Sequence, residues 1–240
     1  TMRDAVIVST ARTPIGKAYR GSFNATTPQA LAAHAITHAV KKAGIEGHEI
    51  SDCILGAALQ QGHSSTNIAR QAAICAGLPV TVAGMSLDRQ CASGMMAIAT
   101  AAKQIMHDGM DIVIGGGVES ISMVQTLEMR VGSDKWLKDN KPEMYMTMLE
   151  TAENVATRFN ISREVQDAYA AQSQERTHAA QQAGKLDDEV VAMSTTMMIQ
   201  NKETKELTSH EVTIEKDEGN RPGTSAESLA GLKPVFKDGL

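Results

Sequence analysis

The sequence contains few of the residues that several functional classes require. Aromatic side chains make up 3% of the chain, too few for the stacking platforms that bind single-stranded nucleic acid. No apolar run approaches the roughly 18 residues that a membrane span needs. Basic residues do not outnumber acidic ones, with 23 Lys+Arg against 28 Asp+Glu. This balance gives no general attraction to nucleic acid or anionic membranes. We therefore expect no nucleic-acid partner and no membrane insertion.

Cysteine is also scarce. The three cysteines, Cys53, Cys75 and Cys91, include no CxxC pair, which argues against a disulfide framework or a zinc site of that type. We expect no metal, and a reducing cytoplasm is the simplest compartment. The N-terminus shows no charged segment followed by an apolar one, as a signal peptide would. Cys53 lies in an apolar run and Cys75 in an Ala-rich stretch, so core packing is expected for both.

The first half of the sequence alternates between apolar, β-branched runs and Ala-rich stretches. Strands are predicted at 5–9, 53–55, 82–87 and 111–114, and helices at 28–43, 67–77 and 92–107. Thr27 is a candidate N-cap before Pro28, Gly44 a candidate stop, and Asn67 a second N-cap. Buried strands that alternate with helices predict an α/β fold with a mixed, mainly parallel sheet between helical layers.

The alternation fades from residue 119 onward. Residues 1–118 carry nine basic and seven acidic side chains, whereas residues 119–240 carry 14 and 21. Helices are predicted at 151–159 and 162–183, and a strand-and-loop excursion at 200–220. We therefore predict an α/β domain over 1–118 and an inserted α+β domain over 119–240.

Cys91 is predicted to lie where a strand ends and a helix begins. The free N–H groups and the positive dipole end of a helix N-terminus stabilise a thiolate. Three small residues follow the cysteine and leave room for a substrate. Position alone nevertheless favours a small buried hydrophobe at a helix start.

Five segments of the sequence resemble, in order, segments of the thiolases (acetyl-CoA C-acyltransferases). They are VIVSTARTPIG at 6–16, DRQCASGM at 88–95, GGGVESIS at 115–122, TAENVA at 151–156, and the segment 224–236 that ends in LKPVF. The matches extend over nearly the whole chain. The sequence is therefore similar to the N-terminal domain and the inserted loop domain of a thiolase.

This resemblance implies an acyltransferase. Thiolases move an acyl group from a 3-ketoacyl-CoA or acetyl-CoA onto a cysteine, and then to CoA or to a second acetyl-CoA. Cys91 is the implied nucleophile, acyl-CoA and CoA are the implied substrates, and no separate cofactor or metal is implied. A homodimer or homotetramer is the implied assembly.

The resemblance also implies the residues that contact CoA. They are Arg221, Ser228, Leu232 and Phe236, and Met148 aligns with the acyl-chain pocket. A guanidinium suits a phosphate or the adenine, and a hydroxyl suits the pantetheine amides. Without the resemblance, Arg221 would be an ordinary solvated charge, and Leu232 and Phe236 would be core residues.

Part of the family's machinery has no match in these 240 residues. A histidine that activates the nucleophile and a second cysteine belong to a C-terminal thiolase domain, which we expect to be absent from this chain. An alternative is therefore a truncated, non-catalytic CoA-binding or dimerisation module of thiolase origin. A third hypothesis, the condensing branch of the superfamily, fits less well because those relatives usually lack the long insertion.

Two positions depart from the family pattern. Asp88 stands where thiolases usually have Asn, and a carboxylate near Cys91 disfavours its thiolate. Thr147 stands where biosynthetic members tend to carry His, and its neighbours look like those of degradative members. A degradative 3-ketoacyl-CoA thiolase is therefore the favoured type.

Overall fold

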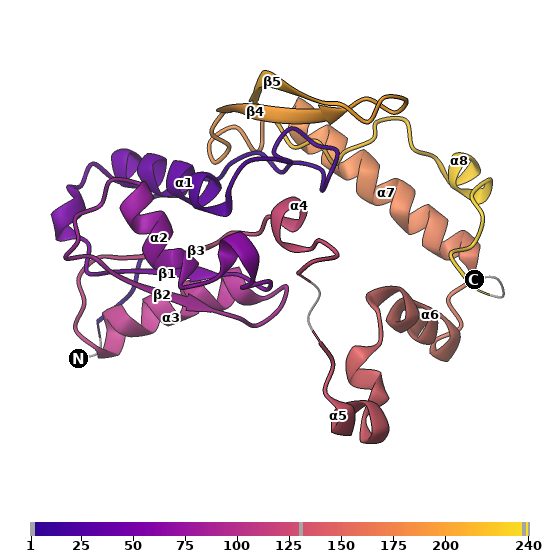
Figure 1. Ribbon diagram of the computed structural model, residues 1–240, viewed down its shortest axis with the longest axis horizontal. Coiled ribbons are helices and arrows are strands. Elements are labelled where there is room, and N and C mark those ends of the chain that lie inside the picture. The colour runs from indigo at the N-terminus through magenta and orange to yellow at the C-terminus, as the bar shows by residue number, and fades with distance from the viewer. Residues whose placement is uncertain (1–2, 130–131, 237–238, 240) are drawn as a thin grey trace. The chain divides into compact units, whose positions relative to one another are not determined.

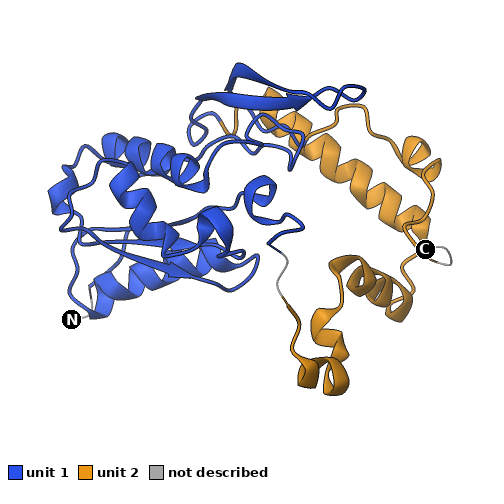
Figure 2. Cartoon of the chain, viewed as in Figure 1, with its two compact units in different colours: residues 1–130, 187–219 blue, residues 131–186, 220–240 orange. Residues whose placement is uncertain are grey.

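The chain divides into two compact units. The computed structural model describes residues 3–129, 132–236 and 239. Unit 1 comprises residues 1–130 and 187–219, and unit 2 comprises residues 131–186 and 220–240 (Figure 2). The two units are groups of residues that contact one another closely. The boundary expected at residue 118 is defined differently, by the order of domains in the family. The predicted division into 1–118 and 119–240 therefore stays a prediction.

Unit 1 contains a three-stranded parallel sheet with strand order β2-β1-β3 (Figure 1). The strands are β1 (Asp52–Gly56), β2 (Ala83–Leu87) and β3 (Val113–Gly117), and the helices between and before them are α1 (Pro28–Ala43), α2 (Ile68–Cys75) and α3 (Ser93–His107). Asp52 of β1 pairs with Ala83 of β2 and with Val113 of β3. The carboxyl ends of all three strands therefore lie at one edge of the sheet. The predicted α/β class with a mainly parallel sheet is confirmed.

Helices cover both faces of this sheet. Cys53 and Leu55 belong to a core cluster with residues of α1 and α2. Ile54, between them on β1, belongs instead to a cluster with Ala97 and Ala101 of α3. Successive side chains of a strand point to opposite faces, so one strand serves both layers. Every residue of β1 is buried, as expected for the central strand of a covered sheet.

The helix ends follow the capping residues that the sequence predicts. The Thr27 hydroxyl accepts a hydrogen bond from the Ala30 N–H at the start of α1, and Gly44 ends that helix at φ 68°. The Asn67 side chain accepts from the Arg70 N–H at the start of α2. Each cap satisfies a backbone group that the first or last turn leaves unpaired. These three predictions are confirmed.

The buried strand predicted at residues 5–9 is wrong. These residues form no strand, and Val6, Ile7 and Val8 are 71–76% exposed. They line a cavity of about 930 Å³ that is also lined by residues 112–118, which include the edge strand β3. A β-branched composition favours a strand, but a strand forms only by pairing with a neighbour. Residues 5–9 pair with none of the strands that the structure describes.

An antiparallel hairpin completes the regular structure of unit 1. It consists of β4 (Met193–Gln200) and β5 (Leu207–Ile214), with Met193 opposite Ile214. These two residues are buried together with Phe23 from the N-terminal loop. The strand predicted within 200–220 corresponds to β5. Unit 1 also contains the short helices η1 (Gly47–Glu49), η2 (Gly62–Ser64) and α4 (Ile121–Val124).

Unit 2 is helical. It contains α5 (Lys135–Asn140), η3 (Pro142–Tyr145), α6 (Met148–Arg158), α7 (Arg163–Gln182) and α8 (Ala226–Ala230). The helices predicted at 151–159 and 162–183 are confirmed as α6 and α7. Thr147 and Glu150 form a reciprocal capping box at the start of α6. In the described part of the chain, every helix is too short or too polar to cross a lipid bilayer.

Candidate active site

Cys91 lies at the carboxyl edge of the parallel sheet. It occupies the turn between the end of β2 at Leu87 and the start of α3 at Ser93. Its thiol is free and its side chain is exposed, so the alternative of a small buried hydrophobe is wrong. Ligands of parallel α/β sheets bind outside the carboxyl ends of the strands. The position predicted from the sequence is thus a position where a substrate can reach the sulfur.

The turn that carries Cys91 is held in an unusual backbone conformation. Gln90 has a φ of 49°, a left-handed conformation that a non-glycine residue rarely adopts. The Asp88 carboxylate accepts the Gln90 N–H at 2.7 Å. The buried Ser93 hydroxyl donates to the Gln90 carbonyl at 2.6 Å and accepts the Arg89 N–H at 2.8 Å. Side chains on both sides of Cys91 therefore fix the turn.

Two glycines let α3 approach the sheet closely at this turn. A Cβ atom at Gly56, the last residue of β1, would lie 2.1 Å from the carbonyl carbon of Ser93. A Cβ atom at Gly117, the last residue of β3, would lie 3.1 Å from the Gly94 Cα. Only glycine fits at position 56, because the backbone of Ser93 lies too close for a Cβ atom. Position 117 likewise leaves little room for a side chain. The glycine-rich motif at 115–117 brings the helix N-terminus to the strand ends.

The three cysteines have different electrostatic surroundings. Cys91 lies just before the 15-residue α3, at the positive end of the helix dipole. Cys75 is exposed, so its predicted core position is wrong, and it is the last residue of α2, at the negative end of that helix's dipole. Burial and, secondarily, the charge of Asp52 raise the pKa of the Cys53 thiol to about 12. Cys53 is a core residue, as predicted, and Cys91 is the thiol best placed to react.

Glu119 also lies at this edge of the sheet, and no role for it is predicted from the sequence. It follows β3, and its carboxylate accepts the N–H groups of Ala58 at 2.9 Å and Leu59 at 3.3 Å, in the loop that follows β1. Glu119 thus ties together two of the loops at the sheet edge that carries Cys91. Its place in the motif at 115–122 is visible in the sequence, but its loop partners depend on the fold.

The residues expected to contact CoA all belong to unit 2, whereas Cys91 belongs to unit 1. Met148 is the first residue of α6 and is 74% exposed. The other four lie within 221–236, around the short helix α8: Leu232 is exposed and Phe236 is half-buried. The structure therefore presents Met148 and Leu232 as open apolar surface. Their contacts with CoA stay a prediction.

The two polar residues of this set already make contacts within the chain. The Ser228 hydroxyl donates to the Ser225 carbonyl at 2.8 Å and accepts the Ser225 N–H at 3.1 Å, as part of the capping box of α8. Its proton is therefore engaged, and its remaining lone pair is the group that could meet a ligand N–H. Arg221 is exposed, so its guanidinium lies at the surface. Its backbone N–H donates to the Gln174 side chain at 2.8 Å.

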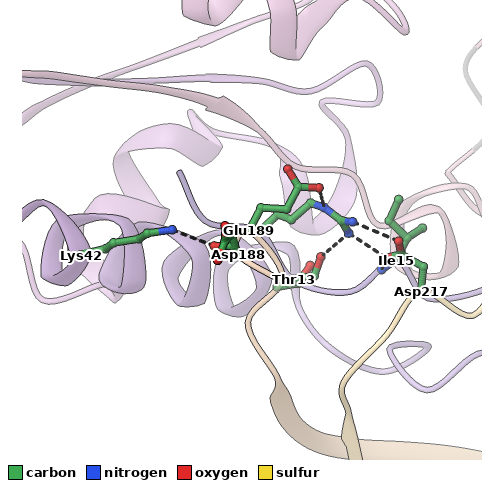
Figure 3. Close-up of polar contacts among 7 residues, drawn as sticks. Thr13, Ile15, Lys42, Asp188, Glu189 and Asp217 are labelled. Atoms are coloured by element: carbon green, nitrogen blue, oxygen red, sulfur yellow. Dashed lines mark hydrogen bonds and ion pairs between the residues drawn. The ribbon is translucent and has the colours of Figure 1, made fainter. Parts of the chain in front are cut away.

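An ion-pair network in unit 1 centres on Arg12, which belongs to the loop motif at 6–16. Its guanidinium donates to Glu189 at 2.8 Å and, in a two-pronged contact, to Asp217 at 2.7 and 3.1 Å (Figure 3). Burial alone would raise the pKa of Asp217. The hydrogen bonds from Arg12 and from the Ile15 N–H outweigh burial, so this pKa lies below its usual value. Nearby, Lys42 donates to the Asp188 carbonyl.

This network joins three distant parts of the sequence within one unit. Glu189 and Asp217 lie 177 and 205 residues from Arg12 in the sequence, and nothing in the local sequence of Arg12 indicates them. It anchors the loop of the opening motif and both ends of the segment that contains the β4–β5 hairpin. The role of the Arg12 network is therefore structural, and none of its residues is near Cys91 in the sequence.

A covered parallel sheet with an exposed cysteine on a constrained strand–helix turn defines the class: an α/β protein with a nucleophile-type turn. The family model for the thiolase N-terminal domain matches residues 5–239. The chain belongs to the thiolase family.

Similar proteins cover almost the whole chain. A 3-ketoacyl-CoA thiolase of Bacillus subtilis is 39% identical over 235 residues, which are 98% of this chain and 60% of that protein. An acetyl-CoA acetyltransferase of Cupriavidus necator is 38% identical over 247 residues, with the same two coverages. A crystal structure of the Bacillus anthracis acetyl-CoA acetyltransferase superposes with a TM-score of 0.79 at 36% identity, over 98% of this chain and 60% of that one. The chain thus has the thiolase fold and spans about 60% of the length of these relatives.

Proposed function

We propose that this chain supports acyl transfer between CoA thioesters and CoA, with an acyl group carried on Cys91. The observation that carries the proposal is the exposed Cys91 thiol, held by Asp88 and Ser93 on a constrained turn at the N-terminus of α3. An exposed thiol that is fixed in direction and lies at the positive end of a helix dipole is well placed to act as a nucleophile.

We propose that the acyl transfer takes place in two steps. With a 3-ketoacyl-CoA, the Cys91 thiolate attacks the keto carbon C3, the bond from C3 to C2 breaks, and its electron pair leaves on C2 as the carbanion of acetyl-CoA, which takes up a proton. With acetyl-CoA as the donor, the thiolate attacks the carbonyl carbon of the thioester, the bond from that carbon to the CoA sulfur breaks, and CoA leaves as a thiolate. In the second step the thiolate of CoA, or the carbanion of acetyl-CoA, attacks the acyl-cysteine and releases the Cys91 thiolate. A backbone N–H at the helix start is a suitable donor to the oxyanion of each tetrahedral intermediate.

The test is to locate the acyl group. The full-length protein is incubated with acetyl-CoA, quenched in acid, digested and analysed by mass spectrometry, alongside the variants Cys91→Ser and Cys75→Ser. We expect one acetyl group on the peptide of Cys91, its loss in Cys91→Ser and its retention in Cys75→Ser. An acetyl group on another residue, or full transferase activity in Cys91→Ser, would contradict the proposal. CoA binding without any acylation would instead support the non-catalytic module.

The substrate class we propose is 3-ketoacyl-CoA, cleaved in the degradative direction. It is supported by Thr147, which acts as the N-cap of α6 where biosynthetic members tend to have His, and by the 3-ketoacyl-CoA thiolases among similar proteins. Rates of thiolysis measured over a series of 3-ketoacyl chain lengths test this. Activity on acetoacetyl-CoA alone would favour the acetyl-CoA acetyltransferase type.

A homodimer or homotetramer in the cytoplasm completes the proposal. The exposed apolar side chains at Val6, Ile7 and Val8 support an assembly, because isolated proteins rarely expose such runs. The three unpaired cysteines fit a reducing compartment. Light scattering on the full-length protein measures the assembly, and a monomer at micromolar concentration would contradict it.

A further inference from the structure

One face of α7 holds the segment that carries most of the expected CoA contacts. Arg163, Asp167, Ala171, Gln174 and His178 recur at intervals of three or four residues, so they share one side of the helix. This side meets the segment 220–232. Asp167 is the buried residue of α7, although it is charged. A buried carboxylate needs a partner, and that partner marks one end of the contact.

Arg163 binds the C-terminal end of the segment 220–232, at the last turn of α8 and just after it. Its Nε donates to both carboxylate oxygens of Asp167 at 2.9 Å. Its Nη2 donates to the carbonyl of Leu229 at 2.7 Å and to that of Leu232 at 3.1 Å. The helix α8 has five residues, too few to be stable alone. The Leu229 carbonyl also accepts the backbone N–H of Leu232 at 2.9 Å, so Arg163 adds a further bond to the last turn of α8 and one to the chain just after it, and Asp167 holds Arg163 in place.

Gln174 binds the beginning of the segment. Its side-chain oxygen accepts the backbone N–H of Arg221 at 2.8 Å and the Asn220 amide at 3.0 Å. Its backbone carbonyl accepts the same Asn220 amide at 2.9 Å. Between the two attachments lies a cavity of about 500 Å³, lined by Ala171, His178 and residues 222–227 among others. The segment is therefore fixed at both ends and open between them.

We propose that Arg163 and Gln174 are positioning residues for CoA. They are 11 residues apart, about 16 Å along the helix axis, and they hold the backbone on either side of Arg221 and Ser228. A segment that is ordered before the ligand arrives does not lose conformational freedom on binding, so it binds more tightly. This inference rests on the proposed function, because that function assigns the CoA contacts. It adds two residues that act on the ligand only through the segment.

The test compares CoA with a donor that lacks the nucleotide. The variants Arg163→Gln and Gln174→Leu are made in the full-length protein. We expect each to raise the KM for CoA about tenfold, the effect of losing one or two good hydrogen bonds to an ordered segment. The rate of Cys91 acylation by acetyl-N-acetylcysteamine, which carries no nucleotide, stays at the wild-type value. Arg163→Lys keeps the charge and one donor, and we expect it to recover part of the CoA affinity.

The matched control is Arg176→Gln. Arg176 is an exposed arginine on the same helix, so its loss changes the net charge equally. We expect the control to bind CoA as the wild type does. If Arg163→Gln does not yield folded protein, Gln174→Leu decides alone.

Two results would overturn the positioning roles. One is a KM for CoA within about twofold of wild type in Gln174→Leu, and the other is an equal fall in acylation by the short thioester, which would indicate general damage. A wild-type protein that neither binds CoA nor acylates Cys91 would instead overturn the proposed function, and the positioning roles with it.

Discussion

The Ser93 hydroxyl donates a 2.6 Å hydrogen bond to the carbonyl oxygen of Gln90, and this bond closes the turn around Cys91. The same hydroxyl accepts the Arg89 N–H, so one buried side chain holds the backbone on the N-terminal side of the cysteine at two points. In the sequence, Ser93 is notable only as a small residue. In the structure, it is the residue that maintains the left-handed conformation of Gln90.

Removal of this hydroxyl should harm both stability and chemistry. In Ser93→Ala the partly buried Arg89 N–H loses its hydrogen-bond partner, and we expect the free energy of unfolding to fall by about 1 kcal/mol. The turn is then free to relax, and we expect acylation of Cys91 to slow by about tenfold. Urea denaturation and single-turnover acylation measure the two effects. Ser173→Ala, at an exposed serine of α7, is the control. Wild-type acylation in a folded Ser93→Ala protein would show that the turn needs no such lock.

The two exposed thiols should differ in reactivity. Cys91 lies at the start of α3 and Cys75 at the end of α2, where the dipole has opposite signs. We expect iodoacetamide at neutral pH to modify Cys91 about tenfold faster than Cys75, while Cys53 stays unmodified in the folded protein. Peptide mass mapping over a time course gives the three rates, and Cys91→Ser and Cys75→Ser confirm the assignments. Faster modification of Cys75 would contradict the electrostatic argument.

Local signals in the sequence predicted the elements that depend on local chemistry. Thr27, Gly44 and Asn67 cap or end helices as expected, because a cap bonds to groups within four residues. Cys91 falls at the expected strand–helix junction for the same reason. The family resemblance supplied the remaining candidates, which local chemistry alone does not identify.

Features that depend on distant partners were missed. Residues 5–9 have the composition of a buried strand, but they pair with none of the described strands. Composition cannot specify such a pairing. The partners of Arg12 lie at Glu189 and Asp217, and those of Arg163 include backbone carbonyls near α8. Backbone acceptors leave no trace in the side chains of a sequence. The Ala-rich stretch around Cys75 predicts a core position because Ala-rich helices are often buried, but Cys75 is exposed.

The charge and the hydrogen bond of Asp88 can be separated. In Asp88→Asn the side-chain oxygen still accepts the Gln90 N–H, but the negative charge three residues before Cys91 is gone. We expect alkylation of Cys91 at neutral pH and low salt to become about twofold faster, and the gain to shrink at high salt. Asp88→Ala removes both functions, so we expect it to weaken the turn and to slow acylation. Equal alkylation rates in wild type and Asp88→Asn at low salt would contradict this.

The Arg12–Asp217 pair should make the stability of the chain depend on acid pH. The folded state holds the pKa of Asp217 below its usual value of about 3.9. A carboxylate with a lowered pKa adds stability that is fully present above the unfolded pKa and is lost as the pH falls through the folded pKa. We expect Asp217→Asn to lower the free energy of unfolding by about 1–2 kcal/mol at pH 7, a value that allows for solvent screening of the pair. The difference from wild type should shrink as the pH falls from about 4 through the lowered folded pKa, below which Asp217 is protonated in both states. Urea denaturation between pH 7 and pH 3 measures the free energy of unfolding of both proteins.

The control is Glu215→Gln, at an exposed glutamate two residues away. We expect this variant to keep the wild-type dependence of stability on pH. If Glu215→Gln weakens that pH dependence as much as Asp217→Asn does, the effect comes from net charge and not from the Arg12 contact.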